Sequence, residues 1–180
     1  MPQMLPTINV CFPRSGHRFL RNILSAYFGK EFKFRENHQK TGYSFEEANY
    51  IKDHDFGIRN NNIGIQMLPK YRYLIQYRHP LESLVSYFEF FVKHERVTDD
   101  RESWNLFFPQ QLDYWKRFVD KWLISVPGDM SLSMHSVVYS KLYGDTYSSV
   151  EQVINFLTNN QSPINTKRLN NTVTRIKLGF

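Results

Sequence analysis

Cysteine is almost absent from this sequence, since Cys11 is the only one in 180 residues. A single cysteine excludes an intramolecular disulfide framework and any zinc site built from several cysteines. Long apolar runs are missing too, because no stretch approaches the roughly 18 consecutive apolar residues of a membrane span. The N-terminal segment has neither a basic region nor an apolar one. We therefore expect no signal peptide and a soluble, reducing, cytoplasmic setting.

An excess of basic over acidic residues is the main feature of the composition. Lys and Arg number 23 against 17 Asp and Glu, and the resulting formal charge of +6 favours anionic partners. Nucleic acid, a membrane surface and a polyanionic small molecule all fit that charge. Hydrophobic residues make up 41% of the chain, too many for a disordered protein. The length predicts one domain spanning residues 1–180.

Short apolar strands alternate with amphipathic helices along the chain. We expect strands at 7–12, 50–56, 72–77 and 136–139, an extended piece at 63–68, and helices at 17–28, 80–94, 104–126 and 150–157, the third interrupted by Pro109. Residues 30–44 are expected to be irregular. The alternation is typical of an α/β fold, a parallel β-sheet flanked by helices. Ligands bind such sheets at the carboxyl ends of the strands, where three polar segments lie.

The first polar segment is Pro13–Arg14–Ser15–Gly16–His17–Arg18–Phe19, between a strand and a helix. A turn with glycine that leads into a helix leaves backbone N–H groups unpaired, and the helix dipole adds positive potential. Such a turn binds phosphate or sulfate oxygens, although an ordinary helix-capping turn contains the same residue types. Arg14 and Arg18 add charge and Ser15 adds a hydroxyl, which favours anion binding. The loop is not a Walker A motif.

The second segment is Lys52–Asp53–His54–Asp55, at the end of another strand. In a strand, Lys52 and His54 lie on one face and the two aspartates on the other, so one face carries a cation and a base. The neighbouring ammonium lowers the pKa of His54 and keeps the imidazole neutral. Because the alternation separates His54 from both carboxylates, a shared metal site is not expected. The alternative is a solvated polar loop.

The third segment joins Arg78, at a strand end, to Ser86 in the helix that follows. A guanidinium and a hydroxyl together form a clamp for a terminal phosphate. Arg78 also has a simpler alternative, which is an ion pair with Glu82 four residues further on.

Together the three segments resemble the motifs of the sulfotransferase superfamily, whose members use 3′-phosphoadenosine 5′-phosphosulfate (PAPS). The loop at 13–19 is similar to the family's P-[KR]-S-G-T-T-W, and Lys52–Asp53–His54 is similar to its K-T-H. Arg78–His79–Pro80 and Ser86–Tyr87 match the pattern R-x-P-x-x-x-x-x-S-Y in residue type and spacing, which makes this match the most specific. The resemblance extends from about residue 7 to 157.

Other positions depart from the family pattern. The loop has His, Arg and Phe where the family has Thr, Thr and Trp, so charge contacts replace hydroxyl contacts there. Of the family's Y-E-D-L segment only Tyr139 and Leu142 remain. The C-terminal R-K-G segment is not recognisable, and its candidate remnants are Arg175, Lys177 and Gly179.

The resemblance implies in-line transfer of a sulfuryl group from PAPS to an acceptor hydroxyl or amine, which leaves 3′,5′-ADP. It implies that His54 is the general base, and that Lys52 and Arg14 stabilise charge on the sulfuryl and phosphate oxygens. The residues implied to bind the cofactor are Arg14, Ser15, Gly16, His17, Arg18, Phe19, Arg78, Ser86 and Tyr139. Among them Arg78 and Ser86 hold the 3′-phosphate, while Phe19 and Tyr139 stack on adenine. No metal is implied.

Other functional classes stay open from the residues. A P-loop-like nucleotide kinase or hydrolase needs a loop Lys followed by Ser or Thr and a magnesium-binding Asp. A non-catalytic polyanion-binding protein would lose affinity steeply with salt. A relative that keeps the cofactor loop without activity is a third alternative. The acceptor, a small molecule, glycan or lipid rather than a nucleic acid, is left undefined by the sequence, as is the oligomeric state.

Overall fold

In the computed structural model, which describes residues 3–37, 43–60, 64–161 and 163–179, five strands form one parallel sheet. The strands are β1 (Thr7–Cys11), β2 (Phe34–Glu36), β3 (Tyr50–Asp53), β4 (Arg72–Tyr77) and β5 (Met134–Val138). Their order across the sheet is β2-β3-β1-β4-β5, and every neighbouring pair is parallel. The predicted α/β fold with a parallel sheet is confirmed.

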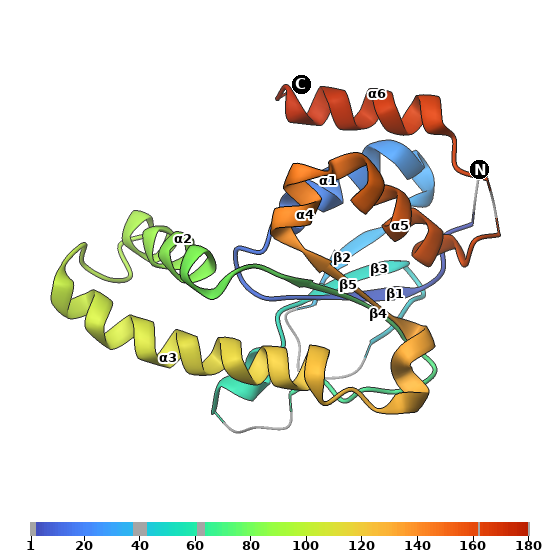
Figure 1. Ribbon diagram of the computed structural model, residues 1–180. Helices are drawn as coiled ribbons and strands as arrows, with labels where there is room; N and C mark the ends of the chain where they lie inside the picture. Colours follow the sequence, from blue (N-terminus) through green and yellow to red (C-terminus); the bar gives the residue numbers. More distant parts are fainter. Residues whose placement is uncertain (1–2, 38–42, 61–63, 162, 180) are drawn as a thin grey trace.

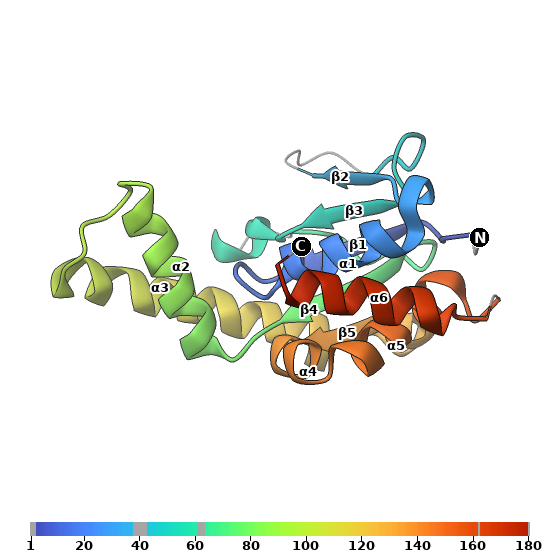
Figure 2. The same cartoon turned by 90° about the horizontal axis from the view of Figure 1, so that it is seen from above.

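Helices cover both faces of this sheet (Figure 1). The α-helices of the described residues are α1 (His17–Phe28), α2 (Pro80–Lys93), α3 (Arg101–Val119), α4 (Tyr139–Gly144), α5 (Thr146–Thr158) and α6 (Thr166–Lys177). α1, α4 and α5 lie on one face with α6 outside them, whereas α3 lies on the other face. Figure 2 shows that α2 and the first part of α3 extend beyond the sheet. None of the helices described here is long and apolar enough to cross a membrane.

The chain direction places the ligand edge between β1 and β4. β1 leads through α1 to β2 and β3 on one side, whereas β4 leads through α2 and α3 to β5 on the other. Where neighbouring strands connect in opposite directions, their carboxyl ends open into a crevice. The loop after β1 and the helix start after β4 are therefore the segments that face this crevice, and both were predicted to bind anions.

The strand predicted at 50–56 is too long. β3 ends at Asp53, and Asp55 has a φ of 50°, in the left-handed region that interrupts a strand. The buried carboxylate of Asp55 accepts hydrogen bonds from Trp122 Nε1 at 2.9 Å and from Lys121 Nζ at 2.8 Å. These bonds hold the chain in a turn instead of letting the strand continue. His54 consequently follows the strand and does not lie in it.

Two other expectations about strands were wrong. Residues 30–44, expected to be irregular, contain the edge strand β2, which pairs with β3 over three residues. Such a short polar strand has no hydrophobic pattern of its own, so the sequence carries no signal for it. Residues 64–68 form no strand, and Ile63 lies outside the described residues.

Pro109 does not interrupt the third helix. α3 runs through it to Val119, and a π-helix (Asp120–Ile124) continues the coil. A proline at this position removes the donor to the Asn105 carbonyl. Both residues are exposed, so water can take the place of the missing donor. The C-terminal segment, for which no element was expected, forms α6.

Candidate active site

The loop at 13–19 is wound tightly between β1 and α1. Arg14 and Gly16 have φ values of 65° and 85°, both in the left-handed region. Glycine is required at position 16 because a Cβ there would collide with the ring of Tyr139. Among the described residues no side chain caps the first turn of α1, so its backbone N–H groups stay available to an anion. Anion binding by this loop remains a prediction from the sequence.

Arg14 and Ser86 are brought together across the crevice. Arg14 Nε donates a hydrogen bond to Ser86 Oγ at 3.0 Å. The bond connects the loop after β1 to the helix after β4, although 72 residues separate the two side chains in sequence. The guanidinium also lies 5.5 Å from the centre of the Phe90 ring. A positive charge is thereby fixed at the crevice.

Arg78 follows the carboxyl end of β4, and part of its guanidinium is bonded to Glu82. Its Nε donates to Glu82 Oε2 at 2.8 Å, which lowers the pKa of the Glu82 carboxyl. The ion pair between Arg78 and Glu82, the alternative to phosphate binding, is thus present. The guanidinium carbon nevertheless lies 4.4 Å from the centre of the Tyr139 ring, the ring that covers Gly16. Trp115 Nε1 donates to the Arg78 carbonyl at 3.1 Å and fixes its backbone.

An aromatic cluster lies beside these arginines. The rings of Tyr139 and Tyr143 stack with centroids 5.9 Å apart, and the Phe19 ring is 6.1 Å from that of Tyr143. Lys177 Nζ donates to the Tyr143 carbonyl at 3.1 Å, so α6 ends at this cluster. Sequence reasoning missed Tyr143, although its position one helical turn after Tyr139 is a signal that could have found it.

His54 is held at the carboxyl edge by a bond to β1. Its Nδ1–H donates to the Cys11 carbonyl at 2.7 Å, which leaves the Nε2 lone pair free to accept a proton. Burial, and after it the charge of Lys52, lowers the pKa of His54 to about 4. The imidazole is therefore neutral at pH 7. Burial raises the pKa of the Cys11 thiol to about 12, so this side chain is not a nucleophile.

Lys52 has a partner that the sequence did not predict. Its ammonium forms an ion pair with Glu36 of β2, and its side chain is only 10% exposed. Nothing in the sequence could have found Glu36, because β2 itself was not foreseen. The carboxylate offsets part of the positive charge that Lys52 would present to an anion.

The imidazole of His17 turns under α1 toward the sheet. Its Nδ1–H donates to Asn9 Oδ1 at 2.8 Å, and Asn9 Nδ2 donates to the Leu74 carbonyl at 2.9 Å. Burial, then the charges of Lys52 and His54, lowers the pKa of His17 to about 2. Its neighbour in sequence, Arg18, is exposed and forms no hydrogen bond or ion pair within the described chain.

Buried polar atoms without partners gather at this edge. Within the described residues such atoms include Ser15 Oγ, His17 Nε2, both amide atoms of Gln76 and Ser83 Oγ. They come from the loop, the start of α1, the end of β4 and the start of α2. Leaving one buried polar group unpaired costs about 1–3 kcal/mol, so a group of them indicates a place built for a polar ligand. Gln76 and Ser83 were not predicted.

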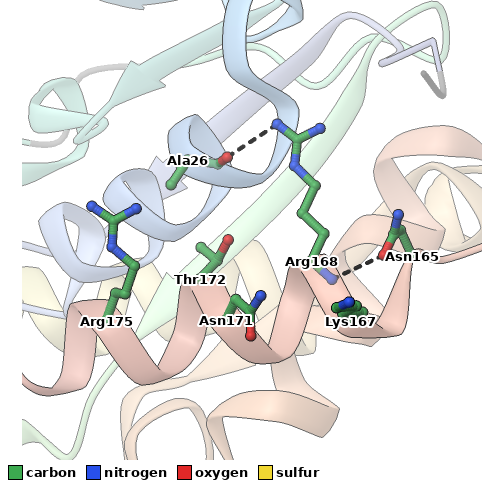
Figure 3. A pocket seen from close by; sticks show the side chains of 7 residues that line it. All are labelled: Ala26, Asn165, Lys167, Arg168, Asn171, Thr172 and Arg175. Carbon is green, nitrogen blue, oxygen red and sulfur yellow. Dashed lines mark hydrogen bonds between the residues drawn. The ribbon is translucent and has the colours of Figure 1, made fainter.

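A separate cavity of about 380 Å³ lies between α6 and the end of α1 (Figure 3). Its lining consists of Ala26, Asn165, Lys167, Arg168, Asn171, Thr172 and Arg175. Arg168 reaches across it and donates to the Ala26 carbonyl at 3.3 Å. None of the residues implied to bind the cofactor or to act in catalysis lines this cavity, although Arg175, a candidate remnant of the R-K-G segment, does. In the described ranges no group of three or more His, Cys, Asp and Glu side chains is arranged to hold a metal.

Solved structures share this arrangement of strands and helices. The structure of mouse sulfotransferase SULT7A1 complexed with PAP aligns with 94% of this chain at a TM-score of 0.61 and 11% identity. The chain has the sulfotransferase fold. The fold that the sequence motifs implied is thereby confirmed. The chain spans 63% of the length of the mouse sulfotransferase.

A sulfotransferase from Alicyclobacillus acidocaldarius also aligns, over 96% of this chain and 94% of its own, with a TM-score of 0.49 and 12% identity. No protein-family model and no curated protein matches the sequence.

Proposed function

We propose that this chain is a PAPS-dependent sulfotransferase that transfers a sulfuryl group to an acceptor hydroxyl or amine. The sulfotransferase fold supports the general kind of reaction, and the mouse sulfotransferase with that fold was crystallised with PAP. The observation that carries the proposal is the group of unpaired buried polar atoms at the crevice, from Ser15, His17, Gln76 and Ser83. Phosphate oxygens accept hydrogen bonds from the donors of this group, the hydroxyls of Ser15 and Ser83 and the Gln76 Nε2 amide.

Each part of a PAPS-type cofactor has residues that fit it. The uncapped first turn of α1 and the hydroxyl of Ser15 suit the 5′-phosphate. Arg78 and Ser86 form the clamp for the 3′-phosphate, for which Arg78 would release Glu82. Arg14, bonded to Ser86, adds its charge for the sulfuryl and phosphate oxygens. The rings beside the clamp, those of Phe19, Tyr139 and Tyr143, suit adenine. When bound, PAPS supplies the sulfuryl group and a stable 3′,5′-ADP leaving group.

His54 supplies the base for the transfer. Its Nε2 would take the proton of the acceptor hydroxyl as the sulfuryl group passes from the phosphate oxygen, which leaves as 3′,5′-ADP, to the acceptor oxygen. The Cys11 carbonyl keeps Nδ1–H and the ring orientation fixed. The low pKa of the imidazole in the free protein keeps Nε2 unprotonated. A nearby nucleotide raises the pKa of His54 by adding negative charge, which makes Nε2 a stronger base. Lys52 stabilises the charge on the transferred group.

Calorimetric titration of 3′,5′-ADP, 5′-AMP and ATP into the wild type and Arg78→Ala tests the proposal. We expect 3′,5′-ADP to bind most tightly, and Arg78→Ala to weaken it by about tenfold or more by removing a charged hydrogen-bond donor. Arg72→Ala is the matched control. Arg72 also stacks on a ring, with its guanidinium carbon 4.3 Å from the centre of the Phe156 ring, but it begins β4 whereas Arg78 follows its end.

Other outcomes of the titration would support other functions. Preferential binding of ATP that needs Mg²⁺ would indicate a kinase or hydrolase. Weak binding of all three nucleotides, lost steeply with salt, would indicate a polyanion-binding protein. Either result contradicts the sulfotransferase proposal.

A further inference from the structure

Arg59 lies against three aromatic rings, in the segment that follows the carboxyl end of β3. It belongs to the 3₁₀ helix Phe56–Asn60, which follows β3 and His54. Its guanidinium carbon is 4.3 Å from the centre of the Phe56 ring, 4.7 Å from that of Tyr114 and 5.7 Å from that of Tyr87. Stacking of this kind stabilises an arginine and fixes the plane of its guanidinium.

The hydrogen bonds of Arg59 leave part of the guanidinium without partners. Nη2 donates to the Tyr87 hydroxyl at 2.8 Å and to Gln111 Oε1 at 3.1 Å. Nε is buried and has no hydrogen-bond partner in the described chain. No carboxylate of the described ranges forms an ion pair with Arg59. A partly buried cation held in place by neutral groups alone would be stabilised by an anionic ligand.

This site adjoins the proposed catalytic base. The rings of His54 and Phe56 have centroids 5.0 Å apart, so Phe56 lies between the imidazole and the guanidinium of Arg59. Tyr114, whose ring contacts both the guanidinium and the Phe56 ring, donates its hydroxyl hydrogen to the His54 carbonyl. Phe56 is 46% exposed, so the ring that packs on His54 is itself accessible to an acceptor. An acceptor that reaches His54 Nε2 from here lies within reach of Arg59.

We propose that Arg59 binds an anionic group of the acceptor, most suitably a carboxylate, and so selects acceptors that carry a negative charge beside the reacting hydroxyl. The proposal rests on the proposed function, because it takes His54 to mark the acceptor site. A planar carboxylate matches the fork of Nε–H and Nη2–H once it replaces Gln111 or Tyr87 as a partner of Nη2, and the stacked rings fix the guanidinium plane before the acceptor arrives. The rings of Phe56 and Tyr114 provide apolar contact for the rest of the molecule.

The test compares two phenols that differ in charge and little in shape, 4-hydroxyphenylacetate and 4-hydroxyphenylacetamide. Their binding to the full chain is measured with and without saturating 3′,5′-ADP, which keeps the carboxylate away from the loop at 13–19. In the wild type we expect the acid to bind at least about tenfold tighter than the amide. Arg59→Met should bring that ratio close to one, whereas Arg59→Lys should retain part of it.

Arg72→Met is the matched control, because Arg72 is likewise stacked on one ring and bonded to the chain, at the far end of the sheet. It should leave the ratio of acid to amide binding unchanged. The NMR signal of Arg59 Nε–H provides a second readout that needs no variant, and it should shift with the acid and not with the amide.

If Arg59 has only a structural role, the ratio of acid to amide binding differs from the one expected above. Equal binding of acid and amide by the wild type, or a ratio that Arg59→Met leaves intact, overturns the proposal. Failure of the proposed function is recognised separately, since 3′,5′-ADP then fails to bind while the Arg59 Nε–H signal still responds to the acid. A protein that binds 3′,5′-ADP but does not distinguish the acid from the amide keeps the proposed function and loses this inference.

Discussion

His54 is tied to Cys11 by a bond from Nδ1–H to the backbone carbonyl, 2.7 Å long, between residues 43 positions apart in sequence. The acceptor is a main-chain oxygen of the central strand, so no substitution at position 11 can remove it. Proton donation at one ring nitrogen decides that the other, Nε2, carries the lone pair. The tautomer of the proposed base is thus set by the sheet itself.

His54→Asn separates this anchoring role from the role as base. The side-chain amide of asparagine can donate from nearly the position of Nδ1, but it has no counterpart of Nε2. We expect sulfuryl transfer from PAPS to fall by at least about 100-fold, the usual contribution of a general base, with 3′,5′-ADP affinity retained. His135→Asn serves as the control, because His135 of β5 stacks on Phe156 of α5. Substantial transfer activity in His54→Asn would rule out the base assignment.

Two histidines with lowered pKa values, His17 and His54, make stability depend on pH. His17 and His54 have folded-state pKa values of about 2 and about 4, below the ordinary value of 6.5. As the pH falls below 6.5, the unfolded chain binds protons that the folded chain does not, so the free energy of unfolding decreases. The decrease is at most about 1.4 kcal/mol per pH unit for each histidine.

For His54 this loss ends near pH 4, where the folded protein also binds the proton, and for His17 it continues below that pH. Urea unfolding between pH 7 and 5 measures it. The double variant His17→Asn/His54→Asn should show a flatter dependence than the wild type. Identical slopes would show that these two histidines do not control it.

Gly16→Ala tests the contact between the loop and Tyr139. The new Cβ meets the Tyr139 ring, and alanine at a φ of 85° adds backbone strain of about 1–3 kcal/mol. We expect a lower melting temperature and weaker binding of 3′,5′-ADP. At Gly144, which has no atom within 4 Å of an added Cβ and no left-handed φ, alanine should leave both unchanged. Equal effects at the two positions would contradict a specific role for the loop.

Glu36→Gln releases the charge of Lys52. Because Lys52 is largely buried, loss of its partner should destabilise the fold, yet the unpaired ammonium should bind an anion more strongly. We expect a few-fold gain in affinity for 3′,5′-ADP, largest at low salt. Asp113→Asn removes the carboxylate of an exposed ion pair with Arg117 and should do neither. Weaker nucleotide binding in Glu36→Gln would show that Glu36 supports the site instead of competing with the ligand.

The sequence predicted those parts of the site that an apolar run or a turn residue marks over a few consecutive positions. The run at 7–12, the turn around Gly16 and the strand followed by Arg78 each have a period or a turn residue that can be recognised without neighbours. The topology of a parallel sheet then brings such segments to one edge. This accounts for the contact between Arg14 and Ser86.

What the sequence could not predict depends on contacts between distant segments. Glu36 meets Lys52 only because a three-residue edge strand pairs with β3. His17 bonds to Asn9 of β1, a contact that no sequence spacing reveals. Arg59 lies in a 3₁₀ turn, and the rings around it come from three parts of the chain. Asp55, which looked like part of a strand, is fixed by Lys121 and Trp122 far along the chain.

The bond from Trp115 to the Arg78 carbonyl gives the protein an optical reporter of its own. An indole whose N–H is fixed to the backbone of the clamp arginine emits light that depends on the electric field around that bond. A nucleotide phosphate arriving at Arg78 brings negative charge close to the indole. Ligand exchange at the crevice can therefore be followed in real time by intrinsic fluorescence, with no label, and Trp115→Phe identifies the signal.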